Sequence, residues 1–369
     1  MTSLFFYGTL RDLELLNIVL GHSHGEVRAA TLPGYAVYWA KDNAFPMAVA
    51  EHGAQAEGLL IEGVSQSDLD RLDFYEGGFA YATLEADVGG AKTARVFLPE
   101  PGMWQAGAPW SLSDWQAKWG AVVREGAREV MSYYGTLDPA RVVGMYPAIL
   151  SRAQAALNAR SVSAPARGTT PSSTDVVVHT RDTAYAGFFN VVEATLQFPT
   201  FSGGLSAPVH RAIFQMADAV TVVPYDPVRD RVLLIEQFRA APFMRGDADP
   251  WMMEPIAGRV DAAEDYETAV RREAEEEAGL TLRALHQVAR QYPSPGAVTE
   301  FLVSYVGICD LPDDVVGVGG LTSEQEDIRS HIFDVEVALE MADAGAFRAT
   351  PLLMTLYWLA RHRDRLRGA

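Results

Sequence analysis

Cysteine, positive charge and long apolar runs are all scarce in this sequence. A single cysteine, Cys309, occurs among the 369 residues, which excludes an internal disulfide framework and a thiolate zinc site. The formal net charge of −18 argues against nucleic-acid binding, because phosphates are met by a basic surface. No apolar run approaches the ~20 residues that a membrane span needs, so no membrane partner is expected. These absences favour an enzyme for small molecules, or a protein whose excess carboxylates hold divalent cations.

The first residues, MTSLFFYGTLRDLELL, lack the basic region and the small-residue cleavage site of a signal peptide. The lone cysteine lies in the apolar context YVGICDL, so we expect it in a core and in a reducing compartment. Together these features predict a cytoplasmic protein.

The length is about twice that of a typical domain, and the pattern along the chain predicts two domains. Residues 159–174 are rich in Ser, Thr, Pro and Ala without periodicity, which is typical of a linker. Residues 1–158 begin with short strands and end in helices. Residues 175–369 return to strands, with a long helix predicted over 263–278 and another at the C-terminal end. The expected fold class is a mixture of α/β and α+β in two domains.

The helix predicted over 263–278 carries the clearest signal of chemistry. At 100° per residue it begins with an apolar stripe, formed by Tyr266, Ala269 and Val270. Three glutamates continue that stripe at spacing i, i+3, i+4, namely Glu273, Glu276 and Glu277. Converging anions repel one another and are costly to bury unless cations neutralise them. Oxygen ligands suit Mg²⁺, or alternatively Mn²⁺, so this face predicts a metal site; a solvated helix face explains only Glu275.

A longer pattern surrounds these glutamates. The segment GRVDAAEDYETAVRREAEEEAGL, from Gly258 to Leu280, resembles the whole Nudix box, G-x5-E-x7-R-E-U-x-E-E-x-G-U, with the small Ala274 at its hydrophobic position. The resemblance implies that residues 175–369 form a Nudix hydrolase fold, an αβα sandwich. Enzymes of this family cleave nucleoside diphosphates that are linked to another moiety.

Blocks outside the box are similar to the ADP-ribose pyrophosphatases of that family. They are SPGAVTE, VLLIEQFR, EPIAG and GGLTSEQEDIRSH, and they keep the same order and spacing over about 190 residues. The ensemble also resembles the Nudix proteins associated with tellurite resistance in some proteobacteria. The resemblance implies hydrolysis of ADP-ribose to AMP and ribose 5-phosphate by a homodimer associated through the Nudix domain.

The resemblance also implies roles for particular residues. The expected metal ligands are the Ala257 carbonyl, Glu273, Glu276, Glu277 and Glu326. Glu324 is expected to orient or deprotonate the attacking water, Arg239 to pair with phosphate, and Glu300 to bond the substrate or a water. A solvated acidic loop is the alternative for Glu324 and Glu326, and a surface salt bridge is the alternative for Arg239.

The N-terminal segment FFYGTLRD resembles the start of the γ-glutamylcyclotransferase-like (AIG2-like) family, whose fold is a small β-barrel with helices. There the backbone of Tyr7, Gly8, Thr9 and Leu10 is expected to receive a substrate carboxylate. A second block, AEGLLIEGVSQSDLDRLDFYEGGFAYATLEADV, carries Glu76, the family's proton-shuttling carboxylate. Such a role needs a partly buried glutamate with a raised pKa. A degenerate binding or dimerisation module is the alternative for this domain.

Two other functions stay open for the Nudix domain at this point. One is a non-catalytic sensor that binds ADP-ribose while the N-terminal domain acts as an interaction module. The presence of all three box glutamates, Glu273, Glu276 and Glu277, weighs against a sensor function. The other is an enzyme for a different dinucleotide or nucleotide sugar.

Overall fold

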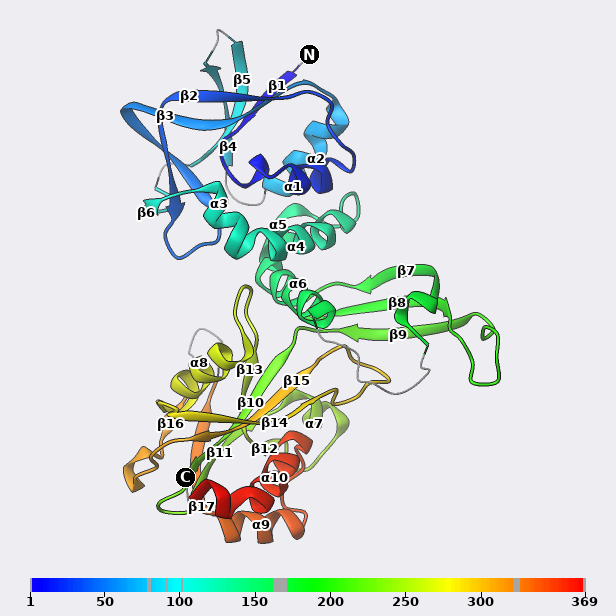
Figure 1. Cartoon of the computed structure of the whole chain (residues 1–369), viewed down its shortest axis with the longest axis vertical. Helices are drawn as coiled ribbons and strands as arrows, with labels where there is room; N and C mark the ends of the chain where they lie inside the picture. Colours follow the sequence, from blue (N-terminus) through cyan, green and yellow to red (C-terminus); the bar gives the residue numbers. More distant parts are fainter. Residues whose placement is uncertain are drawn as a thin grey trace. The chain divides into compact units, whose positions relative to one another are not determined.

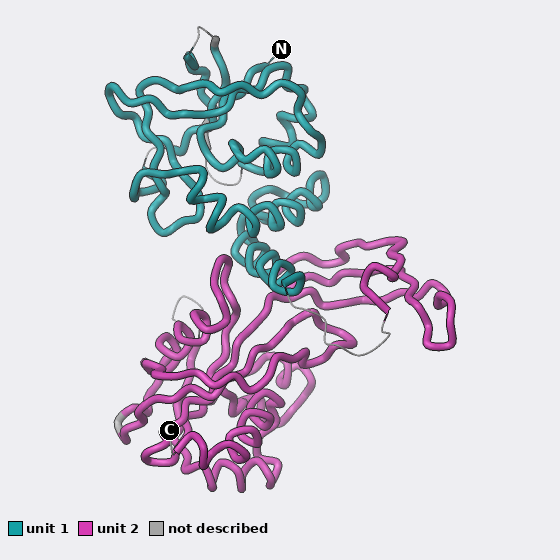
Figure 2. The backbone as a smooth tube through the Cα atoms, in the orientation of Figure 1, with its two compact units in different colours: residues 1–163 teal, residues 164–369 magenta. Residues whose placement is uncertain are grey.

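The computed structural model describes residues 2–77, 81–89, 92–100, 102–161, 171–320 and 326–367 (Figure 1). Its contacts separate two compact units, Met1–Ser163 and Ala164–Ala369 (Figure 2). Most of the segment predicted as a linker, residues 162–170, lies outside the described residues. At its edges, residues 159–161 belong to helix α6, and Ser173–Asp175 forms the 3-10 turn η3.

Unit 1 is built on a mixed six-stranded sheet in the order β4-β5-β1-β3-β2-β6, in which β1 pairs antiparallel with β3 and parallel with β5. The sheet curls back on itself, because the N–H of Gly89 after β4 donates to the carbonyl of Thr31 in β2 at an N···O distance of 2.8 Å. This contact closes the small β-barrel that the sequence predicts. The strands are β1 Thr2–Phe6, β2 Val27–Ala40, β3 Pro46–Val64, β4 Tyr81–Val88, β5 Lys92–Pro99 and β6 Ala106–Pro109.

The helices of unit 1 begin where the sequence offers a cap. The Asp12 carboxylate accepts from the N–H of Leu15 at 3.0 Å and starts α1, while Ser65 and Asp68 form a capping box that starts α2. A π turn, η2 (Gln116–Gly120), joins α3 to α4, and the 3-10 turn η1 (Thr9–Arg11) follows β1. The helices are α1 Leu13–Leu20, α2 Gln66–Glu76, α3 Leu112–Trp115, α4 Ala121–Ser132, α5 Pro139–Gly144 and α6 Tyr146–Ser161.

Unit 2 contains an eight-stranded sheet along the path β14-β15-β10-β11-β17-β16, with β12 paired to β11 and β13 to β10. Successive side chains of a strand point to opposite faces. Accordingly, Val222 and Leu233 pack in the core beneath α8, whereas Val223 and Val232 pack beneath α9 and α10. Helices therefore cover both faces, which confirms the predicted αβα sandwich. The strands are β10 Ala219–Asp226, β11 Arg231–Phe238, β12 Trp251–Glu254, β13 Ile256–Arg259, β14 Ala284–Gln291, β15 Leu302–Ile308, β16 Val318–Gly319 and β17 Ile328–Asp334.

A second, antiparallel sheet of unit 2 joins β7 (Val177–Tyr185), β8 (Asn190–Gln197) and β9 (Val209–Gln215). Every residue of β7 is exposed. The end of β9 is tied to the loop before β15, because the N–H of Phe214 donates to the carbonyl of Ala297 at 2.8 Å.

Helix α8 runs over Tyr266–Ala278 and so begins three residues later than predicted. Asp265 accepts from the N–H of Thr268 at 2.7 Å, and Ala263 has a left-handed φ of 60°, so residues 263–265 form a turn and cap. The other helices of unit 2 are α7 Ala240–Arg245, the 3-10 turn η4 Asp313–Val315, α9 Val335–Asp343 and α10 Thr350–Arg367. Within the described ranges, none of the helices has the length and apolar character needed to cross a membrane.

Candidate active sites

Helix α8 brings Glu277 into the core of unit 2. Its buried face holds Ala269, Val270 and Ala274, and one turn further on lies Glu277, of which 3% is exposed. The small Ala274 is fully buried, so its hydrophobic position in the motif serves packing beneath the helix. Gly279 then ends the helix in the left-handed conformation that favours glycine.

The Glu277 carboxylate has an unsatisfied oxygen. The backbone N–H of Ala257 donates to this carboxylate, but its Oε2 atom is buried and has no hydrogen-bond partner among the described residues. Burial, reinforced by the charges of Glu273 and Glu326, raises the pKa of Glu277 to about 9. A buried carboxylate with an orphan oxygen is costly unless a cation or a proton meets it.

Glu273 lies directly over the backbone that leads into the helix. A Cβ atom at Gly258 would stand 1.9 Å from the Glu273 carboxyl carbon, so only glycine leaves room for this side chain. Burial raises the pKa of Glu273 to about 7 against the opposing effect of Arg272. The structure therefore brings Glu273, Glu277 and the backbone before α8 together, while Glu276 keeps 30% of its side chain exposed.

Arg272 supplies the positive charge of this cluster. Its Nη1 donates to Glu273 at 2.7 Å and to Glu276 at 2.9 Å, its Nε donates to Glu264 at 3.1 Å, and its Nη2 donates to the carbonyl of Arg259 at 3.0 Å. Arg272 belongs to the Nudix box, but no role was predicted for it from the sequence. The contacts show that it clamps the glutamates of the helix to the preceding turn.

The donor set of this face fits a hard cation. In the part of the chain that the structure describes, no three His, Cys, Asp or Glu side chains are already gathered into a set able to hold a metal ion. Nevertheless, the orphan oxygen of Glu277 is what an oxygen-liganded divalent cation would satisfy, and the Gly258 backbone leaves room for the Glu273 carboxylate beside it. A bound cation would replace the hydrogen bonds that Arg272 donates to Glu273 and Glu276.

The loop that carries Glu324 and Glu326 lies only partly within the residues that the structure describes. Glu326 lies close enough to raise the pKa values of both Glu273 and Glu277, and its Cβ would be 2.8 Å from a Cβ at Gly320. Glu324 lies outside the described residues. The structure thus brings Glu326 to the two helix glutamates.

Arg239, directly after β11, and Glu300, in the loop before β15, act on the same group of carboxylates. The Nε of Arg239 donates to Glu254 at 2.8 Å, and the Arg239 charge lowers the pKa values of Glu277 and Glu300. Burial, together with the charge of Asp218, still holds the pKa of Glu300 above its usual range. Sequence reasoning missed Glu254, whose pKa burial also raises. Its place in the EPIAG block was the available signal.

Unit 1 holds a pocket at the end of β1. Its wall includes the backbone turn from Tyr7 to Leu10, and Glu76, the last residue of α2, faces the same space. The remaining wall is largely aromatic and includes Phe5, Phe6, Phe45, Tyr75, Phe97, Trp115 and Tyr146. The structure therefore brings together all five residues that the sequence predicted for this domain.

Glu76 has the electrostatics of a proton carrier. Burial alone raises the pKa of its carboxyl to about 7. Burial and the Glu76 charge raise the pKa values of Tyr7 and Tyr146, so both hydroxyls stay protonated. Sequence reasoning missed Tyr146, because its helix lies far from the two motif blocks.

Comparisons with known proteins match both units. The family described as "Gamma-glutamyl cyclotransferase, AIG2-like" matches residues 4–117, and the NUDIX domain matches residues 216–353. An ADP-ribose pyrophosphatase of Escherichia coli strain K12 is 36% identical over 194 residues, which is 53% of this chain and 92% of that protein.

Three further matches cover the second half of the chain. An ADP-ribose pyrophosphatase of Haemophilus influenzae is 33% identical over 51% of this chain and 87% of that protein. A GDP-mannose pyrophosphatase of Salmonella arizonae is 31% identical over 43% of this chain and 80% of that protein. The solved structure of an ADP compounds hydrolase has a TM-score of 0.42 and 18% identity, over 54% of this chain and 98% of that one. On its sequence matches, the chain belongs to the Nudix family of pyrophosphohydrolases, and its first unit carries an AIG2-like γ-glutamyl cyclotransferase domain.

Proposed function

We propose that unit 2 is a Mg²⁺-dependent hydrolase, with Mn²⁺ as the alternative metal, that cleaves the pyrophosphate of ADP-ribose to AMP and ribose 5-phosphate. The observation that carries this proposal is the buried carboxylate of Glu277, with one orphan oxygen, beside Glu273 on one face of α8. A solvated acidic helix would leave neither group buried.

Glu273, Glu276, Glu277, Glu326 and the Ala257 backbone would hold the metal. A divalent cation bound there supplies positive charge to the phosphoryl oxygens and lowers the pKa of a bound water. Arg239, already paired with Glu254, offers its planar fork to the diphosphate. Glu324 takes the proton as the water oxygen bonds to phosphorus and the bridging P–O bond breaks. Glu300 forms a hydrogen bond with the substrate or with a water.

The choice of ADP-ribose rests on the named relatives. The two ADP-ribose pyrophosphatases match at 36% and 33% identity, and a GDP-mannose pyrophosphatase matches at 31%. GDP-mannose, another nucleoside diphosphate sugar or a dinucleotide is therefore the competing substrate. A sensor that binds ADP-ribose without cleaving it is the competing function.

Incubation of the full chain with Mg²⁺ and either ADP-ribose or GDP-mannose, with AMP and GMP followed by chromatography, tests the proposal. We expect AMP from ADP-ribose, and a fall in kcat of at least about 100-fold in Glu277→Gln. Glu275→Gln is the matched control, because Glu275 is exposed on the same helix and should keep full activity. Tight ADP-ribose binding without turnover would select the sensor, and GMP release alone would select the other substrate.

A second activity, in unit 1, is favoured by the environment of Glu76. We propose that this unit cyclises a γ-glutamyl amine to 5-oxoproline and a free amine. The α-nitrogen bonds to the γ-carbonyl carbon as the amide C–N bond breaks. Two protons leave the α-nitrogen and two reach the departing nitrogen, and Glu76 relays them. The turn from Tyr7 to Leu10 receives the α-carboxylate on its N–H groups.

Release of 5-oxoproline from γ-glutamyl amides, followed by mass spectrometry, tests this activity. Glu76→Gln should abolish release, since an amide cannot relay the proton. Asp70→Asn, an exposed position on the same helix α2, should leave release unchanged. A wild-type chain that releases no 5-oxoproline from any γ-glutamyl compound would make unit 1 a binding module instead.

We further propose a homodimer through unit 2 and a cytoplasmic location. The homodimer is supported by large exposed side chains on and beside the three-stranded sheet, including Val178 at 57%, Phe188 at 62% and Leu205 at 52% exposure. Light scattering coupled to size-exclusion chromatography should give twice the chain mass of 40.2 kDa, and a monomer mass would refute the dimer.

A further inference from the structure

The pocket of unit 1 is completed by helices that lie beyond the family match. That match ends at residue 117, yet Val123 on α4 and Tyr146 at the start of α6 line the same pocket as the Tyr7–Leu10 turn and Glu76. Tyr146 is therefore part of the pocket in this chain without belonging to either motif block.

Tyr146 stands at the Glu76 end of the pocket. The Tyr75 side chain, next to Glu76 in sequence, hydrogen-bonds the Tyr146 hydroxyl. The Glu76 charge acts directly on that hydroxyl, as it does on the hydroxyl of Tyr7. A carboxylate that relays protons between the two nitrogens must lie beside the departing amine. Because Tyr146 lies next to Glu76, its ring is placed to contact the departing amine.

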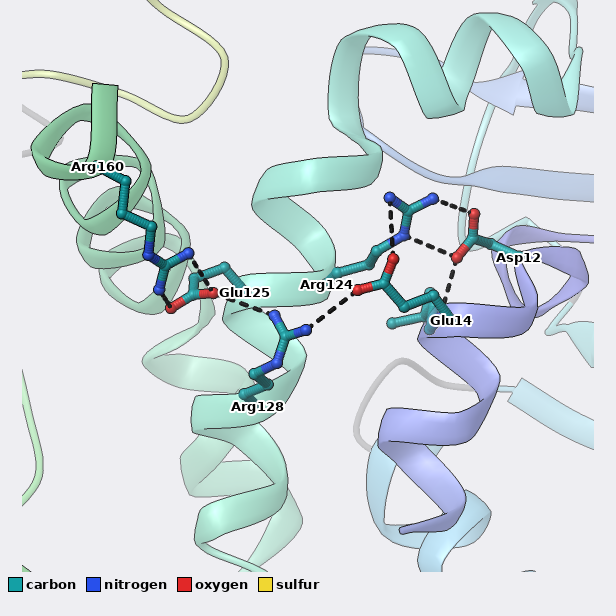
Figure 3. Close-up of polar contacts among 7 residues, drawn as sticks. Asp12, Glu14, Arg124, Glu125, Arg128 and Arg160 are labelled. Atoms are coloured by element: carbon teal, nitrogen blue, oxygen red, sulfur yellow. Dashed lines mark hydrogen bonds and ion pairs between the residues drawn. The ribbon is translucent and has the colours of Figure 1, made fainter. Parts of the chain in front are cut away.

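Buried and exposed ion pairs hold this wall in place. The Nε of Arg152 on α6 donates to Glu129 on α4 at 3.1 Å, and Arg152 is only 3% exposed. A chain of ion pairs then links α6 to α4 and α4 to α1, from Arg160 through Glu125, Arg128 and Glu14 (Figure 3). Close packing adds to this, since a Cβ at Gly126 would be 3.0 Å from Leu150. Tyr146 thus lies on a helix that is joined to α4 by ion pairs and close packing.

Apart from Glu76 and the tyrosine hydroxyls, the wall around Tyr146 is largely apolar. Among the described residues that line the pocket, Glu76 is the only charged side chain, and aromatic rings form most of the remaining surface. Such a surface selects the departing group by its size, because one methylene more or less in an apolar pocket changes kcat/KM by ~10–200-fold.

We propose that Tyr146 is a specificity-determining residue, whose ring limits the size of the amine that unit 1 can release from a γ-glutamyl substrate. This inference rests on the cyclotransferase activity proposed above. The helical segment after residue 117 thereby sets the substrate range of unit 1, while the barrel supplies the carboxylate turn and Glu76.

The test uses the full chain and the methylamide, butylamide and benzylamide of γ-glutamate, with kcat and KM measured from 5-oxoproline release. In Tyr146→Ala, the ratio of kcat/KM for benzylamide over methylamide should rise at least about tenfold. In Tyr146→Trp, the same ratio should fall, and this second variant decides the matter if the alanine variant does not fold. Tyr146→Phe should keep the wild-type ratio, because the ring and not the hydroxyl sets the size limit.

Tyr134→Ala is the matched control. Tyr134 stacks edge-on against Phe74 on α2 at 5.4 Å between ring centroids, yet it does not line the pocket. An active wild type whose size ratio is unchanged in both Tyr146→Ala and Tyr146→Trp would overturn this inference and leave the cyclotransferase intact. A wild type that neither converts the amides nor binds 5-oxoproline in calorimetry would overturn both.

Discussion

Glu76 and Glu277 both have carboxyl groups that are shielded from water. They differ in whether other carboxylates lie nearby. Burial alone raises the pKa of Glu76, with aromatic rings around it. Glu277 has two further carboxylates, Glu273 and Glu326, acting on it in addition to burial. An isolated buried carboxyl near neutrality suits proton transfer, whereas clustered carboxylates suit a divalent cation. The same residue type therefore stands in two environments that suit different chemistries.

Glu76→Gln should stabilise unit 1, and more so at higher pH. The native carboxyl titrates at about 7 and the unfolded one at 4.5, so between these values the folded state keeps a proton that the unfolded state has lost. Wild-type stability therefore falls as pH rises through this window, and the loss is complete above it. Urea unfolding followed by circular dichroism should show a gain of up to about 3 kcal/mol for the variant at pH 8 and little at pH 4. An equal gain at both pH values would contradict the assigned environment.

Gly258→Ala should disable unit 2 without replacing any charged residue. The added Cβ would meet the Glu273 carboxyl carbon at 1.9 Å, which forces that side chain away from its position beside Glu277. We expect ADP-ribose hydrolysis to fall at least about 100-fold in kcat, because displacement of a catalytic group by ~1 Å can cost that much. Gly317→Ala is the control, since nothing lies within 4 Å of its Cβ position. Full activity of the Gly258 variant would show that Glu273 is dispensable.

At this scale, spacing predicted which helix glutamates are turned inward but not what they contact. Helical periodicity correctly predicted Glu273 and Glu277 on the buried face and Glu275 in solvent, whereas Glu276 keeps 30% of its side chain exposed. Glu254 and Tyr146 could not be predicted in the same way. Their roles depend on tertiary packing that brings distant segments together, and no local pattern encodes it.

Helices α1 and α4 are joined by a buried ion pair between Asp12 and Arg124. Asp12 is 2% exposed, caps α1, and accepts from the Nε of Arg124 on α4 at 2.8 Å. Figure 3 shows this pair beside the more exposed contacts of Arg128 and Arg160. Because the Asp12 carboxylate has no access to water, its partner cannot be replaced by solvent.

Arg124→Ala should therefore destabilise unit 1 by about 3 kcal/mol, since it leaves a buried charge unpaired. Arg160→Ala removes a pair whose arginine side chain is 62% exposed and should cost less than about 1 kcal/mol. Urea unfolding of both variants at one pH gives the comparison. Equal losses in the two variants would mean that burial of Asp12 has no energetic consequence.

Capping residues decided where helix α8 begins. The acidic helix was predicted from residue 263, but Asp265 and the left-handed Ala263 delay its start to Tyr266. The αβα layers of unit 2 and the barrel of unit 1 were predicted through family resemblance. Strand pairing itself, such as the parallel contact of β1 with β5, was not predicted, because it depends on contacts distant in sequence.

The whole molecule combines two units that each possess a core. One core cluster lies wholly within unit 1, and two others lie within unit 2 beneath α8 and beneath α9 and α10. Each proposed site is likewise built from residues of a single unit.

The two activities should accordingly separate by single substitutions in the full chain. Glu277→Gln should abolish AMP release and leave 5-oxoproline release within about twofold of wild type, and Glu76→Gln should do the reverse. Both products are measured from the same preparations, so each unit serves as the folding control of the other. Loss of both activities in either variant would show that the sites are coupled.

The single cysteine has a practical consequence. Cys309 is 1% exposed, and burial raises the pKa of its thiol to about 12, so thiol-directed reagents will not reach it in the folded chain. A cysteine introduced on any exposed position of this protein is then the sole site for a maleimide dye. Two such positions, one in each unit, would carry a donor and an acceptor without removal of any native residue. The chain is therefore suited to single-molecule measurement of the distance between its two units.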